Sequence, residues 1–288
     1  MWVRKKPIVG GVALLALLGA LGVFVVLRSV VSNIKLPQLG PECTVSADGK
    51  VTLDSQQMAN AATITAVGVR RGFPEQAVVV ALATAFQESK LENLDDGDRD
   101  SVGLFQQRPS QGWGTFEQIK DPRYAAGKFY SALKKVKGWQ EMRVTDAAQK
   151  VQRSAYPEAY EKWADESKVL AAALTGRATG AVECRYTGTP VIRGAEAATA
   201  LLASLKLDWG KKLPNKAAAT GTAGLTVDVP SADSGWRYAH WLVSHAAVSG
   251  LERVRFADLE WHAPEGKWQP VTDGGDTTTA RVVAEVFR

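Results

Sequence analysis

The chain has few residues of the kinds that bind metal ions. It contains two cysteines and three histidines among 288 residues. The histidines are His240, His245 and His262, and the first two are five residues apart, which is about 140° around a helix and places them on different faces. Because a structural zinc site needs four ligands, the sequence predicts neither a metal site nor a bound cofactor.

Positive charge is in excess only at the N-terminus. Residues 1–35 contain no acidic residue and five basic ones, Arg4, Lys5, Lys6, Arg28 and Lys35. The whole chain has a formal net charge of +5, so residues 36–288 carry no net charge (+5 minus +5). Nucleic-acid binding, which a basic domain surface would indicate, is therefore not expected.

Only one long hydrophobic run is present. Twenty-one uncharged residues separate Lys6 from Arg28, a length that spans a bilayer core at about 1.5 Å per residue. The basic residues before it predict a cytoplasmic N-terminus over 1–6, a transmembrane anchor over 7–31 and an exported remainder, hence a single-pass protein of the cell membrane. The alternative is a cleaved signal peptide, but its apolar region is about 7–15 residues long and precedes a small-residue cleavage site.

The two cysteines, Cys43 and Cys184, stand on either side of the central part of the chain. In an exported protein an even pair indicates a disulfide, so we expect a Cys43–Cys184 bond. The alternative is a pair of free buried thiols.

The remaining residues divide into a tether over 32–52, a mainly helical domain over 53–176, a linker over 177–234 with a short helix, and a small α+β module over 235–288. Asp54 with Gln57, and Asp121 with Pro122, are typical helix starts. Residues 91–114 are rich in Asp, Gly, Ser and Gln, and so long a loop in a compact domain is usually functional. In the last module, four tryptophans form either the core or a carbohydrate-binding surface, and we expect the core: Trp236, Trp241, Trp261 and Trp268.

Glu88 ends an otherwise apolar segment. Residues 77–86 are apolar except for Thr84, which predicts a helix buried on all sides. Such a helix would place the Glu88 carboxyl group, partly removed from water, at the wall of a cleft. An acidic loop follows it in the sequence and contains Glu92, Asp95, Asp96, Asp98 and Asp100. Desolvation and neighbouring negative charge help a carboxyl group to keep its proton, as a general acid for glycosidic bonds requires.

Gln87-Glu88-Ser89 is followed by Asp98 to Ser101 and then by Gly103-Leu104-Phe105-Gln106. This combination resembles the lysozyme-like superfamily of soluble lytic transglycosylases and goose-type lysozymes. The family pattern is Glu-Ser at a helix end, Gly-Leu-Met-Gln about fifteen residues later, and Ala-Tyr-Asn further along. Here Phe105 replaces Met, and Ala155-Tyr156-Pro157 stands where Ala-Tyr-Asn would be. The resemblance covers residues 53–176 and implies a mainly α lysozyme-like catalytic domain.

The resemblance implies a role for each matching residue. Glu88 would protonate the glycosidic oxygen between N-acetylmuramic acid and N-acetylglucosamine, and Ser89 would orient it. The other cleft residues would be Gln106 and Gln107, Trp113 stacked on a sugar, and Tyr156 bonded near Glu88. Asp98 or Asp100 would position water in a hydrolase, whereas a transglycosylase closes the sugar's own O6 onto C1 without a second carboxylate; both routes stay open.

We therefore expect an exported, membrane-tethered enzyme that cleaves peptidoglycan glycan strands. A composition rich in Ala, Gly, Val and Arg is typical of proteins from high-GC Gram-positive bacteria, the actinobacterial type. One alternative is a catalytically weak wall-binding or scaffold component of an envelope-spanning secretion or DNA-transfer machine. Another is a chitinase-type hydrolase with the same fold. The sequence identifies no protein partner.

Overall fold

The computed structural model describes residues 42–214, 217–221, 224–272, 274 and 277–288. The expected transmembrane anchor over 7–31 and residues 32–41 of the expected tether lie outside these residues, whereas residues 42–52 of that tether belong to a β-hairpin. The predicted fold class, a mainly α domain behind a transmembrane helix with a small α+β module, is wrong. The chain is about 47% helix and 18% strand, it has two β-sheets, and no helix in the described ranges is long and apolar enough to cross a bilayer.

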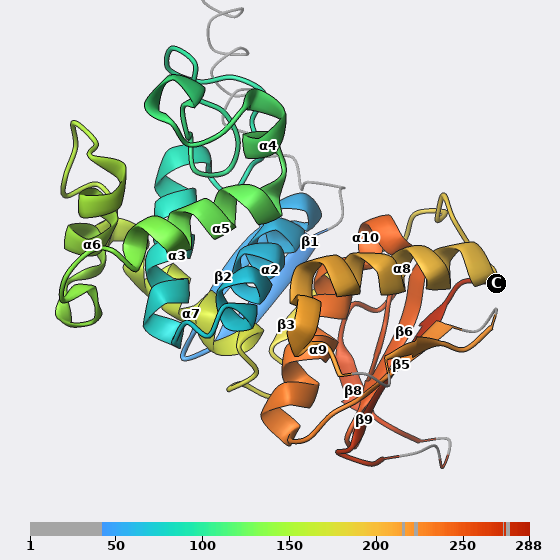
Figure 1. Ribbon diagram of the computed structural model, residues 1–288. Helices are drawn as coiled ribbons and strands as arrows, with labels where there is room; N and C mark the ends of the chain where they lie inside the picture. The colour runs from blue at the N-terminus through green and yellow to red at the C-terminus, as the bar shows by residue number, and fades with distance from the viewer. Residues whose placement is uncertain (1–41, 215–216, 222–223, 273, 275–276) are drawn as a thin grey trace, which may run out of the picture. The chain divides into compact units, whose positions relative to one another are not determined.

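The first half of the described chain is mostly helical (Figure 1). Its longer helices are α2 (Ser55–Arg70), α3 (Glu75–Ser89), α5 (Pro122–Leu133), α6 (Val144–Gln152) and α7 (Ala164–Leu174). Shorter ones are α4 (Phe116–Lys120) and the 3-10 turns η1 (Pro109–Gln111), η2 (Trp139–Glu141) and η3 (Glu161–Trp163).

The expected helix starts are confirmed. Asp54 caps α2 by accepting from the Gln57 N–H at 2.8 Å, and the Gln57 side chain accepts from the Asp54 N–H at 3.0 Å, a reciprocal capping box. Asp121 caps α5 ahead of Pro122. Helix α3 is buried continuously from Ala77 to Phe86 and packs against α7, α6 and α2, as its apolar sequence predicted.

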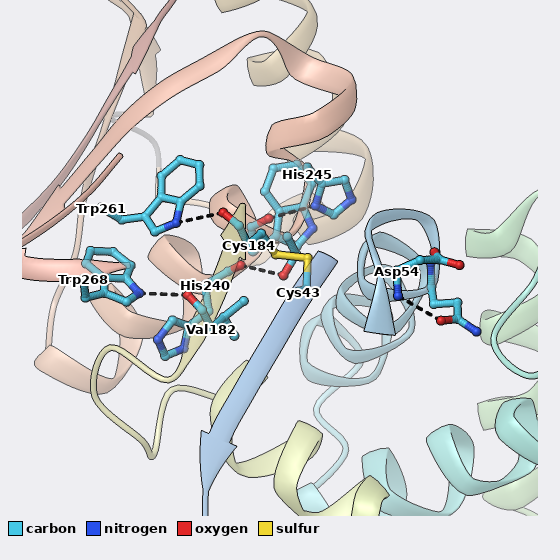
Figure 2. The surroundings of a disulfide bond; sticks show 11 residues. Cys43, Asp54, Val182, Cys184, His240, His245, Trp261 and Trp268 are labelled. Atoms are coloured by element: carbon cyan, nitrogen blue, oxygen red, sulfur yellow. Dashed lines mark hydrogen bonds between the residues drawn. A yellow bond between two sulfur atoms is a disulfide. The ribbon is translucent and has the colours of Figure 1, made fainter. Parts of the chain in front are cut away.

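The first β-sheet joins segments that are far apart in the chain. Strands β1 (Glu42–Ala47) and β2 (Gly49–Asp54) form a hairpin, and β3 (Val182–Arg185) pairs with the other edge of β1. Cys43 and Cys184 are directly opposite each other in this pairing, and they form the expected disulfide (Figure 2). The disulfide therefore fixes the register of β1 against β3.

The second sheet has six strands in the order β4-β5-β9-β6-β7-β8. The strands are β4 (Ala218–Ala219), β5 (Gly224–Asp228), β6 (Leu251–Phe256), β7 (Leu259–His262), β8 (Trp268–Pro270) and β9 (Arg281–Val286). Helices α8 (Gly194–Trp209) and α9 (Ala232–Ser244) pack against it (Figure 1). The 3-10 turn η4 (Gly210–Lys212) follows α8, and the short helix α10 (Ala246–Ser249) follows α9. Strands β4 and β5 lie in the stretch that was expected to be a linker.

This sheet is buried on one face, and the buried side chains alternate along its strands. They are Leu225, Val227, Val254, Phe256, Trp261, Val282, Ala284 and Val286. The opposite face carries ion pairs such as Arg253–Glu285 and Arg255–Glu260. An antiparallel sheet with one face on the core and one in solvent is the usual arrangement. Trp236, Trp241 and Trp261 are buried, so they belong to the core.

Helix α9 connects the second sheet to the helical part, because it packs against α7, α2 and β3 as well as β6. The His240 ring is fully buried; its Nδ1–H donates to the Ala173 carbonyl at 2.8 Å, and its Nε2 accepts from the Ala181 N–H at 2.9 Å. The indoles of Trp261 and Trp268 donate to the carbonyls of Cys184 and Val182 in β3 (Figure 2). Both sheets are thus part of one packed unit.

A buried carboxylate adds a polar connection at this junction. Asp208, in α8, has no exposed surface. It accepts from Thr63 Oγ1 and Trp241 Nε1, each at 2.8 Å, and from Arg123 Nε at 2.5 Å. Since these partners come from α2, α9 and α5, four helices meet at Asp208, and the buried carboxylate is hydrogen-bonded as burial requires.

Candidate active site

Glu88 lies in the last turn of α3, where the buried helix reaches the surface. The helix ends at Lys90, whose φ of 57° is left-handed, a common way for a helix to end. Residues 77–86 before it are buried, whereas Gln87 and Glu88 are half-buried. The helix therefore presents Glu88 at the position that its sequence pattern predicted.

Two neutral side chains hold one oxygen of Glu88. The Tyr160 hydroxyl donates to Glu88 Oε1 at 2.7 Å, and the Gln152 amide donates to the same oxygen at 3.1 Å. Burial raises the pKa of Tyr160 well above its usual range, and the charge of Glu88 raises it further. The phenol therefore stays protonated and acts as a donor.

The second oxygen, Glu88 Oε2, accepts no hydrogen bond from any part of the chain that the structure describes. A carboxylate oxygen with two donors is a poor place for a proton, because the proton would face the donors' own hydrogens. Oε2 is therefore the oxygen of Glu88 that is left for another hydrogen-bond partner.

Gln152 also ties Glu88 to the motif of residues 103–106. Its amide nitrogen donates to the Phe105 carbonyl at 2.9 Å as well as to Glu88. Because Gln152 is the last residue of α6, one side chain connects the ends of α3 and α6 with this turn. The sequence analysis did not identify Gln152, because its neighbours in the sequence do not distinguish it from a solvent-exposed glutamine at the end of a helix.

Ser89 does not touch the Glu88 carboxylate. It is buried, and its hydroxyl lies 2.8 Å from the Leu104 carbonyl and 3.1 Å from the Ala85 carbonyl. Next to it, Gln87 accepts from Trp163 Nε1 at 3.0 Å. These contacts fasten the end of α3 to the turn at Leu104, and an orienting role of Ser89 toward Glu88 stays a prediction.

The turn of residues 103–106 is closely packed. Gly103 has a φ of +76°, and a Cβ there would lie 2.9 Å from the Ile119 carbonyl oxygen, so a side chain is excluded. Phe105 is fully buried and stacks on Phe129 with ring centroids 4.8 Å apart. Phe105 therefore fills the core as one of a pair of stacked aromatic rings.

The Gln106 side chain makes its hydrogen bonds inside the loop, whereas the Gln107 side chain bonds to α5. Gln106 Oε1 accepts from Ser101 Oγ at 2.9 Å, and its amide nitrogen donates to the Gly103 carbonyl at 3.2 Å. Gln107 is buried, and it donates to the Ala125 carbonyl at 3.1 Å. Gln107 thus anchors the loop to α5, while the half-buried Gln106 can meet a substrate only by exchanging partners.

Neither aspartate of the expected pair contacts Glu88, Tyr160 or Gln152. Asp98 is exposed, with 88% of its side chain accessible, and it lies 3.8 Å from Arg99. Asp100 accepts from the Ser110 N–H at 2.8 Å and from Arg108 Nε at 2.6 Å. Those hydrogen bonds, that of the Ser110 N–H first, hold the pKa of Asp100 well below its usual range. Asp100 therefore stays ionised and braces the loop.

The tyrosine next to Glu88 is Tyr160, not Tyr156. Tyr156 is 73% exposed, whereas Tyr160 has no exposed surface. The dipeptide Ala-Tyr occurs twice, at 155–156 and again at 159–160. The second copy was the sequence feature that could have identified Tyr160 as the tyrosine beside Glu88. Trp113 is half-buried and lines a groove that also includes Gln152.

The described part of the chain holds no group of three or more His, Cys, Asp or Glu side chains arranged to bind a metal ion. No protein-family model matches the sequence, and no curated protein matches it either. The site must therefore be interpreted from its own residues and geometry.

Proposed function

We propose that this protein cleaves the glycan strands of peptidoglycan with Glu88 as its single general acid and base. The observation that carries the proposal is the arrangement around Glu88: a half-buried carboxyl group at the end of a buried helix, with two neutral donors on Oε1 and none on Oε2. A positioned acid of this kind is what glycosidic bond cleavage requires.

In the first step Glu88 Oε2 gives its proton to the glycosidic oxygen, and the C1–O bond breaks with its electrons going to that oxygen. Negative charge then develops on Glu88 as positive charge develops at C1. The Tyr160 hydroxyl and the Gln152 amide already point at this charge, and preorganised donors stabilise a transition state without reorganisation. Neither donor can lose its proton to Glu88, because both are neutral groups of high pKa.

In the second step Glu88 takes a proton from the group that attacks C1. When that group is the sugar's own O6 hydroxyl, the product is a 1,6-anhydro sugar; when it is water, the product is a reducing end. The O6 route needs no second carboxylate. We favour it because Asp100 is committed to Arg108 and Ser110, and the exposed Asp98 carboxylate pairs with Arg99 alone among the described residues.

An extracytoplasmic location is part of the proposal. The Cys43–Cys184 disulfide supports it, since disulfides persist in oxidising compartments and are rare in the cytosol. Peptidoglycan is the polymer that an exported enzyme of this type would meet.

Glu88→Gln tests the catalytic assignment. Glutamine keeps the size of the side chain but cannot transfer a proton, so the rate of digestion of purified cell wall should fall by about 10²–10⁴. The matched control is Glu92→Gln, which alters an exposed glutamate and should digest wall at the wild-type rate. Digestion by Glu88→Gln at that rate would show that the assignment is wrong.

The products decide between the two routes. Mass spectrometry of wild-type digests should show 1,6-anhydro ends, which are one water lighter than reducing ends. Asp98→Asn and Asp100→Asn should then keep most activity, whereas a hydrolase would lose it. A wild-type protein that binds wall without cutting it would favour the scaffold alternative, and cleavage of chitin oligomers in preference to wall would favour the chitinase alternative.

A further inference from the structure

A long groove begins beside the candidate active site. It has a volume of about 1150 Å³ and is lined by the loop at Gln111–Trp113, by residues 128–137 of α5 and the following turn, and by the end of α6. Gln152, which holds Glu88, is one of its lining residues. Pockets for small ligands measure about 300–1,000 Å³, so this groove is large enough for a segment of a polymer.

The charge of the groove is of one sign. Its lining contains five basic residues and no acidic one; the basic residues are Lys128, Lys135, Lys137, Lys150 and Arg153. None of the five forms an ion pair with a carboxylate among the described residues. The net charge of residues 36–288 is zero, and this local excess was therefore invisible in the composition.

The acidic side chain that interacts electrostatically with Lys150 is itself paired elsewhere. Asp146, in α6, lies close enough to Lys150 for the lysine's charge to help lower its pKa, but the larger cause is its hydrogen bond from Arg143. Arg143 engages both Asp146 and Glu158, so those acids are already paired. Four of the five basic groove residues, all except the half-buried Lys128, are exposed.

The walls between the cations are apolar. Trp113, Val136 and Met142 are partly buried and pack against the core, and all three line the groove. Apolar and aromatic surface suits the face of a sugar ring, while lysine side chains around it supply charge. A neutral polysaccharide would use the apolar walls and leave the cations unpaired.

We propose that this groove binds anionic groups carried by the glycan strand, so that the protein prefers charged peptidoglycan to neutral glycan. The inference rests on the proposed function for the identity of the strand. A cleft lined by one sign of charge concentrates ligands of the opposite sign. On peptidoglycan the anions are the carboxylates of the stem peptides or the phosphates of attached polymers.

The test is a binding measurement on the full-length Glu88→Gln protein, which holds strands without cutting them. The strands are native wall fragments, the same fragments with their carboxylates converted to methylamides, and fragments stripped of phosphate polymers with hydrofluoric acid. The groove variant is Lys135→Gln with Lys150→Gln. The matched control is Lys206→Gln with Lys211→Gln, which removes two exposed lysines in α8 and η4.

The groove variant should bind native fragments about 2–25-fold more weakly than the control, because each of the two exposed ion pairs contributes between about 1.4-fold and fivefold in affinity. The difference should shrink on fragments that lack the relevant anion, and raised salt should weaken native binding, since exposed charges are screened. Loss on methylamidation identifies carboxylates as the ligand, and loss after hydrofluoric acid identifies phosphates.

Equal binding of all fragments, or equal binding by the groove and control variants, would overturn the inference. So would tighter binding of a DNA oligonucleotide than of native fragments, which would assign the groove to a nucleic acid. These readouts do not depend on catalysis. A wild-type protein that never cuts wall therefore refutes the proposed function without deciding the role of the groove. In the same way, a groove variant that binds as well as the control refutes the role of the groove without deciding whether Glu88 is catalytic.

Discussion

Tyr160→Phe removes a single oxygen atom next to the proposed acid. The ring stays in its fully buried position, whereas the 2.7 Å hydrogen bond to Glu88 Oε1 is lost. Gln152 then remains as the only donor to that oxygen among the described residues. The variant therefore isolates the contribution of the phenol from the packing of the side chain.

The expected fall in kcat depends on how much stronger the hydrogen bond from Tyr160 to Glu88 is in the transition state than before the reaction. A hydrogen bond to a charged group contributes about 1.5–3 kcal/mol, and each 1.36 kcal/mol is tenfold in rate, which gives a limit of roughly 10–150-fold. The hydroxyl also contacts the neutral acid before the reaction, and only the gain in the transition state accelerates the step. We therefore expect kcat to fall by about tenfold, near the lower end.

The assay is the rate of solubilisation of purified cell wall, with thermal unfolding as the check on folding. The matched control is Tyr156→Phe, which makes the same change four residues earlier at a side chain that is 73% exposed, and its rate should match the wild type. If Tyr160→Phe digests wall as fast as Tyr156→Phe does, the phenol does not support Glu88 in the transition state.

Two further predictions concern stability and location. Burial lowers the pKa of His240 from 6.5 to about 4, so the unfolded chain binds the proton at a higher pH than the folded chain does. The contribution of His240 to the free energy of unfolding is therefore complete above pH 6.5 and is lost as the pH falls towards 4. Between pH 7 and pH 5 the free energy of unfolding should fall by about 2 kcal/mol. Urea unfolding should show a weaker pH dependence for His240→Gln, and an unchanged one would contradict the assignment. Non-reducing peptide mapping of protein from intact cells should recover Cys43 linked to Cys184, whereas two freely alkylated thiols would contradict the disulfide and remove its support for an extracytoplasmic location.

Structural features that depend on neighbouring residues could be predicted from the sequence. The capping box of Asp54 and Gln57 depends on residues three apart, and its prediction is confirmed. The uninterrupted apolar residues of α3 predicted a helix buried on every side, and this pattern placed Glu88 at its polar end. The disulfide was also predictable, because the chain offers one possible pair of cysteines.

Pairings between distant segments were decided by the tertiary structure. Strand β3 completes the first sheet by pairing with β1, and β5 pairs with β9 across more than fifty residues. Both strands are short, four and five residues, so their local sequence carries little signal, and their β conformation depends on the partner strand. The predicted fold class was wrong for this reason.

The partners of the proposed acid were decided in the same way. Two Ala-Tyr copies four residues apart look equivalent in the sequence, but the turn before α7 buries Tyr160 against Glu88 and leaves Tyr156 in solvent. The basic groove gathers residues from α5, α6 and the turn between them, which the net charge could not reveal. Helix ends follow from neighbouring residues, whereas a hydrogen bond over 72 positions, such as that of Tyr160 to Glu88, exists only once the helices have packed.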